Sequence, residues 1–525
     1  MNTDVAVSGA GRREWIGLAV IALPCLLYSM DLTVLNLALP RLSADLAPSS
    51  SQLLWIVDIY GFLVAGMLIT MGTLGDRIGR RRLLLMGAAA FGVASVFAAF
   101  STSAGMLIAA RAVLGIAGAT LAPSTLSLIR NMFLDPKQRT VAIGVWATSF
   151  SVGGAVGPLL GGALLQHFWW GAVFLLSVPV MLLLLVVGPL LLPEYRDPGA
   201  GRMDLKSAAL SLIAVLAAIY GMKAWAKDGM GWVPMLSILA GLGVGIVFVQ
   251  RQRKLADPLI DLRLFGVPAF RVSLATFTLT TLVVFGSYVF IAQYLQLVLG
   301  LSPLSAGLWL LPGSCGVILG SMLAPAIVRR VHPAHVIGGG VGLAAIGFGV
   351  LTHVGEAGLL GLVTGSGMVY LGLGPVFTLG TELIVGAAPP ERAGAAAAIS
   401  ETSSELGGAL GIAVLGSIGT AIYRGAMGHA LLDGVPPEAR RAAQETLGGA
   451  AAAAARLPDE IGAQLLATAR EAFVHALEQT AGICAVVAAT TAVVALVTLR
   501  RTRASAEPEG QHRVVAILEK NGALS

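Results

Sequence analysis

The stretch GTLGDRIGRRR, residues 72–82, lies between two long apolar runs and is the segment that decides the fold. Its glycines permit a close approach of helices and a sharp turn, and its acid can pair with a basic residue at a neighbouring helix end. Its last three arginines can face the anionic inner leaflet of a membrane. Ordinary positive charge on the inner side of a membrane explains these arginines but not the spacing of Gly, Asp and Arg. The residues of this stretch that we expect to shape the contact between helices are Gly72, Gly75, Asp76, Arg77, Gly79 and Arg80.

The chain on either side of this stretch is too apolar for an ordinary soluble fold. Of its 525 residues, 56% are hydrophobic and only 12% are charged. Apolar runs of about 20 residues, long enough for a helix to span a membrane, recur along its whole length. We therefore predict an all-α polytopic membrane protein with fourteen spanning helices. The expected spans are residues 14–39, 52–74, 82–100, 104–129, 138–165, 168–192, 205–223, 231–250, 269–299, 303–328, 335–353, 357–387, 394–423 and 473–499.

Lys and Arg concentrate in alternate connections between these spans, and this bias sets the orientation. We expect both termini in the cytoplasm and the chain in the cytoplasmic membrane. The net charge of +6 follows from this topology and requires no nucleic-acid partner. The predicted organisation is a cytoplasmic N-terminus (1–13), an N-terminal six-helix bundle (14–192), linkers with two extra spans (193–268), a C-terminal six-helix bundle (269–499) with a long extracytoplasmic loop (424–472), and a cytoplasmic tail (500–525).

The fifth expected span, GVWATSFSVGGAVGPLLGGALL at residues 144–165, carries a stripe of small residues along one helix face. Small residues let helix backbones approach closely, and the proline removes a backbone hydrogen bond and bends the axis. Packing alone could also account for a glycine-rich membrane helix. The residues of this stripe are Gly153, Gly157, Pro158, Gly161 and Gly162.

These strings resemble signatures of the major facilitator superfamily. The stretch 72–82 is similar to its loop signature, and the fifth span looks like the antiporter signature of its drug:proton export branches. MDLTVLNLALP (30–40) and LWIVDIYGFLVAG (54–66) resemble the fourteen-helix drug:proton antiporters, especially the quaternary-ammonium and methyl-viologen efflux pumps. The resemblance implies a major facilitator fold with two six-helix bundles and two extra central helices. It also implies export and a conformational latch on the cytoplasmic side.

A second copy of the loop signature is expected in the other bundle, because this superfamily is built from related halves. GSMLAPAIVRRV, residues 320–331, is a degraded candidate that keeps Gly320 and the basic pair Arg329 and Arg330 but has no acid. If the two copies correspond, the latch is asymmetric.

Acidic residues inside apolar spans are costly, by about 2.5 to 3.5 kcal/mol each on insertion scales, and therefore indicate function. At 1.5 Å per residue, Asp31, Asp58 and Arg111 fall at a similar depth below the outer ends of their spans. This predicts a charge network in which Arg111 keeps one acid ionised while the other titrates. The family resemblance also links Arg111 to proton transfer.

Glu401 and Glu405 lie one turn apart on the same face of the thirteenth span. Two stacked carboxylates repel in hydrocarbon unless one is protonated or a cation binds between them. The pair therefore predicts competition between protons and a cationic substrate. Glu382, near the cytoplasmic end of the twelfth span, is a further candidate for this role, although water at the inner mouth could equally well solvate it.

Aromatic side chains can supply the π-faces that lipophilic cations bind. Each could alone serve in packing or at the lipid interface, but together they predict a polyspecific apolar pocket. The candidate pocket residues are Tyr28, Trp55, Tyr60, Trp146, Tyr288, Gln293, Tyr294 and Trp309.

We therefore predict a multidrug efflux antiporter that exports lipophilic, cationic compounds such as quaternary ammonium biocides and dyes. The proton gradient would drive it, with no cofactor and no metal, and we expect it to work as a monomer within membrane lipid. The alternative is a dedicated exporter of a single antibiotic or metabolite. A membrane enzyme is disfavoured because the chain offers no nucleophile and base set, and ATP-driven export because it has no P-loop. A structural or sensory protein would have no use for several acids inside the membrane.

Overall fold

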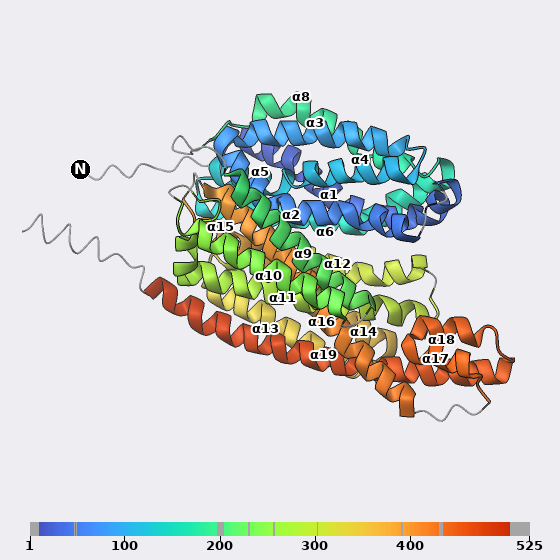
Figure 1. Ribbon diagram of the computed structural model, residues 1–525. Coiled ribbons are helices and arrows are strands. Elements are labelled where there is room, and N and C mark those ends of the chain that lie inside the picture. The colour runs from blue at the N-terminus through green and yellow to red at the C-terminus, as the bar shows by residue number, and fades with distance from the viewer. Residues whose placement is uncertain are drawn as a thin grey trace, which may run out of the picture.

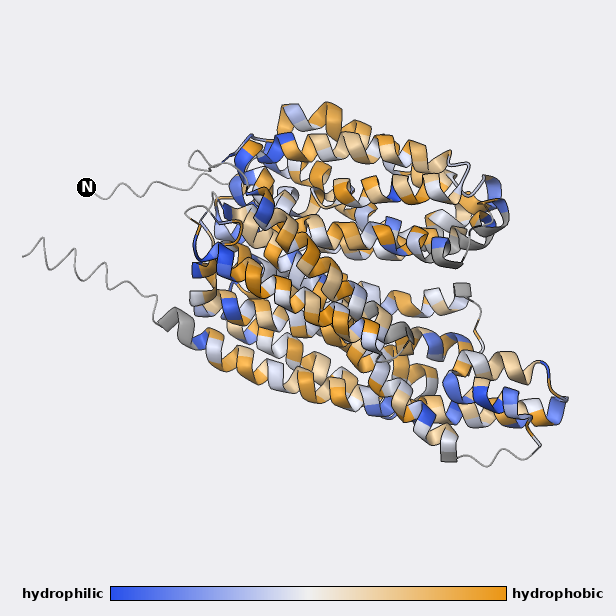
Figure 2. Ribbon diagram, viewed as in Figure 1, coloured by the Kyte–Doolittle hydropathy of each residue, from blue (hydrophilic) through white to orange (hydrophobic). Residues whose placement is uncertain are grey.

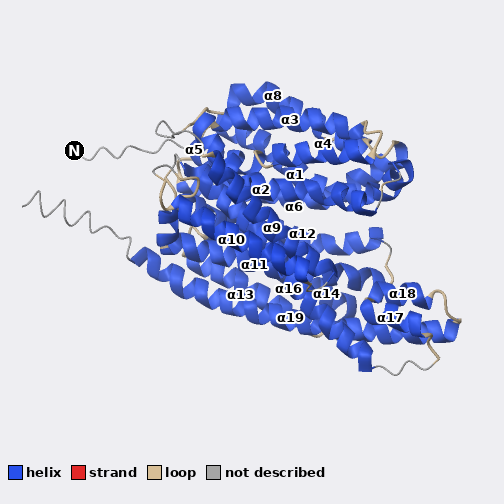
Figure 3. Cartoon of the chain, in the orientation of Figure 1, coloured by secondary structure: helices blue, strands red, loops and turns tan. Residues whose placement is uncertain are grey.

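The computed structural model describes residues 10–46, 48, 50–196, 204–228, 231–255, 258–301, 303–389, 392–429 and 434–504. All regular secondary structure in these residues is helical (Figure 3). Fourteen helical segments are long and apolar enough to cross a membrane. Apolar residues fill the middle of the helices, and hydrophilic residues gather at the two ends (Figure 2). The prediction of an all-α polytopic membrane protein with fourteen spans is confirmed.

The first six spans form one bundle, the N-bundle (Figure 1). Two of its spans are interrupted, because α4 is followed by α5 and α7 by α8 within a single crossing. Its helices are α1 (Arg12–Leu46), α2 (Ser50–Ile78), α3 (Arg80–Ala99), α4 (Ala104–Gly118), α5 (Leu121–Met132), α6 (Pro136–His167), α7 (Ala172–Leu175) and α8 (Ser177–Leu191).

The last six spans form the C-bundle. Its elements are η1 (Leu262–Gly266), α11 (Pro268–Gln293), η2 (Tyr294–Val298), α12 (Pro303–Ile327), α13 (Pro333–Leu351), α14 (Val354–Pro375), η3 (Val376–Gly380), α15 (Thr381–Gly386), α16 (Ala393–His429), α17 (Pro437–Glu445), α18 (Leu447–Ala454) and α19 (Asp459–Ala504). We call the end near Arg12 and Ala504 the termini end, and the opposite end, which carries α17 and α18, the far end (Figure 1).

The segment expected as a long loop over residues 424–472 is largely helical. Helix α16 continues to His429 and α19 begins at Asp459, and α17 and α18 are the helices that the structure describes between them. The Ala-rich sequence continues a helix readily, and Asp459 and Glu460 suit the first turn of α19 because acids favour a helix N-terminus.

The extra pair α9 (Leu205–Asp228) and α10 (Trp232–Gln252) lies beside the seam between the two bundles. Helix α9 contacts both α2 of the N-bundle and α16 of the C-bundle. Phe62 of α2, Val215 and Met222 of α9 and Ala413 of α16 belong to one buried apolar cluster. The pair therefore covers one of the seams along which the bundles meet.

The two bundles repeat one packing device. In the N-bundle, a methyl group added to Gly153 of α6 would overlap the carbonyl of Leu26 on α1. In the C-bundle, a methyl group on Gly411 of α16 would overlap the carbonyl of Leu282 on α11. In each half, a glycine thus lets the fifth span press against the backbone of the first.

Candidate functional site

A buried ion pair lies inside the N-bundle. Nη1 of Arg111 on α4 is 3.1 Å from Oδ2 of Asp31 on α1, and the two side chains are only 1% and 15% exposed. Arg111 also donates through Nη2 to the Val57 carbonyl at 3.5 Å. Its guanidinium lies 5.2 Å from the centre of the Tyr60 ring, within cation–π range. The structure thus brings Asp31 and Arg111 together. Asp58 directly follows Val57, whose carbonyl Arg111 contacts.

Glycine positions Arg111 against α2. A Cβ added to Gly115, one turn after Arg111, would lie 2.7 Å from the Tyr60 carbonyl oxygen, so α4 can approach α2 this closely only without a side chain there. Asp31 also lines a cavity of about 20 Å³ together with Met30, Phe91 and Ser177. A space of this size, with polar groups in its wall, is large enough for one water molecule.

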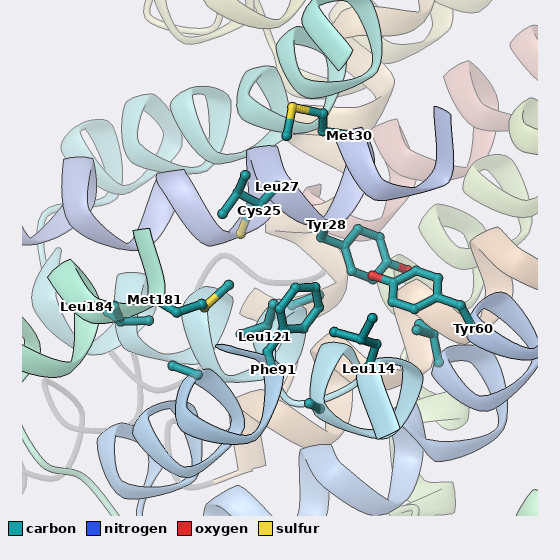
Figure 4. Close-up of a cluster of buried hydrophobic side chains, with 14 of the residues drawn as sticks. Cys25, Leu27, Tyr28, Met30, Tyr60, Phe91, Leu114, Leu121, Met181 and Leu184 are labelled. Atoms are coloured by element: carbon teal, nitrogen blue, oxygen red, sulfur yellow. The ribbon is translucent and has the colours of Figure 1, made fainter. Parts of the chain in front are cut away.

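Two tyrosines connect this ion pair to the C-bundle. The rings of Tyr28 on α1 and Tyr60 on α2 lie side by side, with centroids 6.0 Å apart (Figure 4). The Tyr28 hydroxyl donates a hydrogen bond of 3.4 Å to Oε1 of Glu405 on α16. A series of contacts therefore runs from Asp31 and Arg111 across the faces of both rings, and from the Tyr28 hydroxyl to Glu405 of the other bundle.

Glu401 and Glu405 lie one turn apart on α16 and are both partly buried. The sequence has no Lys or Arg between Arg392 and Arg424, so the spanning part of this helix supplies no cation of its own. The two carboxylates therefore lie close together on a stretch of helix that carries no basic residue.

The predicted aromatic residues fall into separate groups. Tyr28, Tyr60 and Trp146 are buried beside the polar set. Trp146 donates to the Thr125 hydroxyl at 3.0 Å and packs on Phe150, which in turn packs on Tyr28. Sequence analysis missed Phe150, although its spacing of four residues from Trp146 places both on one helix face.

The remaining candidates, Trp55 of the N-bundle and four residues of the C-bundle, are dispersed. Trp55 on α2, Tyr288 on α11 and Trp309 on α12 are 46%, 45% and 43% exposed. Gln293 is half-buried, whereas Tyr294 is buried, with its hydroxyl 3.4 Å from the Val354 carbonyl. Only the group around Tyr28 is therefore seen in contact with the buried acids in the part of the chain that the structure describes.

The loop signature lies at the termini end and contacts the start of α16. Arg80 is fully buried and forms an ion pair with Asp76. Its guanidinium packs on Gly394, and a Cβ on Gly72 would lie 2.7 Å from the Gly394 carbonyl oxygen. Gly79 has a φ of 111°, a left-handed value that favours glycine. The signature thus joins the two bundles at this end.

The rest of the signature is held within the N-bundle. A Cβ on Gly75 would lie 2.6 Å from Nη1 of Arg80, so this glycine makes room for the guanidinium. Arg77 donates to the Thr73 carbonyl at 3.3 Å. The degraded second copy differs, because its basic pair Arg329 and Arg330 is exposed.

The small-residue stripe of α6 faces α1. Besides Gly153, a Cβ on Gly161 would lie 2.8 Å from Val34 of α1, three residues after Asp31. Gly157 is buried, whereas Gly162 faces open space, so it is not part of this contact. The side chain of Pro158 lies outside the described residues. The stripe therefore sets how closely α6 approaches the helix that carries Tyr28 and Asp31.

Glu382 lies apart from the other acids. On α15, it accepts a hydrogen bond of 2.6 Å from the Thr140 hydroxyl of α6, and its other oxygen is 3.8 Å from Nη2 of Arg139. Both partners belong to the N-bundle, so Glu382 contributes to a contact between bundles at the termini end. Among the described residues, no group of three or more His, Cys, Asp or Glu could hold a metal ion.

Residues 21–412 match the family model of the Major Facilitator Superfamily. The multidrug efflux pump LfrA of Mycolicibacterium smegmatis is 44% identical over 93% of this chain and 97% of its own length. The methyl viologen resistance protein SmvA of Salmonella typhimurium is 38% identical over 88% of this chain and 93% of its own. The puromycin resistance protein pur8 of Streptomyces alboniger is 34% identical over 79% and 84%.

Solved structures share the fold at low sequence identity. A bacterial homologue of the human lysosomal transporter Spinster, in an inward-facing and unoccupied conformation, has a TM-score of 0.53 at 19% identity and covers 94% of this chain and 99% of its own. A bacterial homologue of the human drug peptide transporters PepT1 and PepT2 has a TM-score of 0.55 at 16% identity and covers 94% and 98%.

Proposed function

The chain belongs to the major facilitator superfamily, and from this premise we propose that it is a proton-coupled antiporter that exports lipophilic cations across the cytoplasmic membrane. Its efflux-pump relatives make it a drug efflux transporter rather than an enzyme. We place the termini end in the cytoplasm, because the Lys and Arg residues between the spans concentrate there. The transporter would work as a monomer, driven by the proton gradient alone.

The observation that carries this proposal is the set of polar groups that crosses the bundle boundary. Arg111 forms an ion pair with Asp31 at 3.1 Å, so this carboxylate is held by the guanidinium unless the pair separates. Glu405 instead faces a tyrosine hydroxyl and shares its helix with Glu401. We infer that Glu401 and Glu405 exchange protons for cargo, and that Asp31 and Asp58 draw the cation toward them.

The aromatic rings around these acids suit a cationic substrate. Tyr28, Phe150 and Trp146 form consecutive edge-to-face contacts beside Glu405. Ring faces attract cations, and an apolar wall accepts many shapes, as a multidrug pump requires. The relative that confers resistance to methyl viologen, an aromatic dication, supports this substrate class.

The membrane potential sets how many protons are needed. Moving one positive charge outward costs about 2.3 kcal/mol per 100 mV, which one inward proton cancels for a monovalent cation. A dication needs at least two protons. The two glutamates of α16 would provide sites for both.

Transport into sealed vesicles tests the proposal. Purified protein is reconstituted into liposomes, a pH gradient is imposed, and uptake of a fluorescent lipophilic cation is followed. We expect Asp31→Asn to reduce gradient-driven transport to the level of protein-free vesicles, and Glu405→Gln to impair dications more than monovalent cations. Glu438→Gln, a matched exchange on α17 outside the site, should transport normally.

Equal gradient-driven transport by Asp31→Asn and the parent protein would remove this acid from the mechanism. Uniform activity of Glu405→Gln across both charge classes would remove the assigned role of the glutamate pair.

A dedicated exporter of one antibiotic is the second candidate, favoured by the similarity to the puromycin resistance protein. A panel of dyes, biocides and antibiotics distinguishes the two. Transport of several unrelated cations supports the multidrug pump, and transport of one compound alone supports the dedicated exporter.

A further inference from the structure

Thr125 of α5 carries a fully buried hydroxyl that joins three helices of the N-bundle. Its Oγ1 donates to the carbonyl of Leu121, one turn earlier on α5, at 2.8 Å. It accepts a hydrogen bond of 3.0 Å from Nε1 of Trp146 on α6, and the Cys25 thiol of α1 lies 3.5 Å away. A hydroxyl has one donor and two acceptor sites, so a proton that is used within α5 leaves the lone pairs to the neighbouring helices.

The Trp146 indole depends on this hydroxyl for its orientation. The side chain is only 4% exposed, and its N–H group can donate but not accept. A buried donor that loses its acceptor is costly, so the ring is held at the angle that aims Nε1 at Thr125.

The orientation of Trp146 is passed on to two further rings. Trp146 and Phe150 have centroids 4.8 Å apart with 68° between the ring planes, and Phe150 and Tyr28 have centroids 5.7 Å apart with 76° between them. Phe150 is half-buried, whereas the two outer rings are buried, so Phe150 is the ring of this series that a ligand can reach. The series ends at Tyr28, whose hydroxyl donates to Glu405.

A second buried threonine shows what is particular to Thr125. Thr480 on α19 is 1% exposed and donates to the Ala476 carbonyl of its own helix at 2.8 Å. This bond within the helix is the usual way for a threonine to satisfy its hydroxyl in an apolar span. Thr125 makes the same bond and in addition accepts the Trp146 N–H from another helix.

We propose, on the basis of the proposed export of lipophilic cations, that Thr125 is a positioning residue that selects substrates by shape. By holding Trp146 it fixes the angle of Phe150 beside Tyr28 and Glu405, and so presents one ring wall of defined direction. A flat aromatic cation gains from a wall held at one angle, because ring contacts depend on geometry. A globular cation can contact the wall from any direction and gains less.

Binding of two monovalent lipophilic cations tests this role, one flat (ethidium) and one globular (tetraphenylphosphonium). Dissociation constants are measured on the purified full-length protein without a gradient. Thr125→Val keeps the side-chain shape but removes the acceptor, and we expect it to raise the Kd of ethidium about fivefold and that of tetraphenylphosphonium by less than about twofold. Thr125→Ser keeps the hydroxyl and should bind both cations as the parent does.

A double-variant cycle with Trp146→Phe separates positioning from helix packing. Phenylalanine has no N–H group, so adding Thr125→Val to Trp146→Phe should raise the Kd of ethidium no further. A hydroxyl that served only the packing of α5 would act equally with either ring. Thr480→Val, the matched loss of a buried hydroxyl, should leave both dissociation constants unchanged.

An unchanged ratio of the two dissociation constants in Thr125→Val would overturn the proposal, and so would an equal effect of this change in the Trp146→Phe protein. If Thr125→Val fails to fold, Trp146→Phe decides, because an unchanged Kd of ethidium in that variant also contradicts the role of the indole. A parent protein that binds neither cation would instead refute the proposed substrate class. A parent that binds both, with the same ratio in Thr125→Val, refutes the role of Thr125 alone.

Discussion

The N-bundle holds its buried acid beside a cation, whereas the C-bundle holds two acids on a helix stretch without one. Asp31 has Arg111 at 3.1 Å. Glu401 and Glu405 lie on α16, where no Lys or Arg occurs between residues 392 and 424. The packing that surrounds these charges is alike, since Gly153 and Gly411 press against the first helix of their own bundle in the same way.

The difference indicates two kinds of buried acid on one scaffold. Asp31 is paired with a guanidinium from another helix of its own bundle. Glu401 and Glu405 lie one turn apart on one helix, so the two carboxylates repel each other unless a proton or a cation binds between them. In our proposal, the acids of the N-bundle therefore attract the cationic substrate, and the two glutamates of the C-bundle exchange protons for it.

The largest effect on stability and transport is expected from replacing Arg111, the buried partner of Asp31. Arg111→Gln leaves the partly buried Asp31 carboxyl without its guanidinium partner, and breaking a buried pair in this way costs about 3 to 5 kcal/mol. We expect a clearly lower unfolding temperature in detergent and no gradient-driven transport. Both are measured on the purified protein.

The double variant Arg111→Gln/Asp31→Asn is the control for this prediction. With both charges gone, stability should return toward that of the parent while transport stays absent. If Arg111→Gln is as stable as the parent, the ion pair with Arg111 does not stabilise Asp31. The paired acid of the N-bundle would then not differ from the two glutamates of the C-bundle.

A medium effect on stability is expected at the glycine contact that the two bundles share. Gly153→Ala and Gly411→Ala each force a methyl group against a backbone carbonyl, and such overpacking costs about 1 to 3 kcal/mol. Thermal unfolding should show similar losses for both. Gly162→Ala, on the same helix as Gly153 but facing open space, should be nearly neutral. A loss in one bundle alone would show that the packing is not shared.

The smallest effect is expected at the partly exposed ion pair of Arg251 and Asp204, where α10 ends and α9 begins. A hydrogen bond of 2.7 Å from Arg251 lowers the pKa of Asp204 from 3.8 to about 2. A lowered pKa stabilises the folded state above the ordinary pKa, and this contribution disappears as the pH falls through the folded value. Asp204→Asn should reduce the unfolding temperature by only about one or two degrees near neutral pH.

This small difference between Asp204→Asn and the parent should narrow as the pH falls below about 4, where the carboxylate of the unfolded chain begins to bind a proton, and should vanish near pH 2, where the folded carboxylate does the same. If Asp204→Asn lowers the unfolding temperature at neutral pH as much as Arg111→Gln does, the burial of Arg111 does not make its ion pair more important for stability than the pair of Arg251 and Asp204.

Patterns within single helices were predictable from the sequence. Hydropathy located all fourteen spans, and counting residues by depth placed Asp31 and Arg111 at one level, where they form an ion pair. Hydropathy could not locate the end of α16, because an Ala-rich helix can continue beyond the apolar region.

Contacts between the bundles were not predictable. Tyr28 and Glu405 are 377 residues apart, and Arg130 and Ala388 are 258 apart. Their meeting depends on how two separate bundles are oriented, which no spacing within one helix determines. For the same reason, the neighbours of Glu382 in the N-bundle were not foreseen, and water was considered in their place.

The extra pair α9 and α10 has a mechanical consequence. Because α9 packs on α2 and α16 together, a rigid motion that parted these two helices would strip apolar side chains such as Phe62 and Val215 from their neighbours. A motion that keeps α9 in contact with both α2 and α16 preserves those neighbours. The extra pair therefore limits how far α2 and α16 can separate, whereas α6 and α12 form a different contact between the bundles.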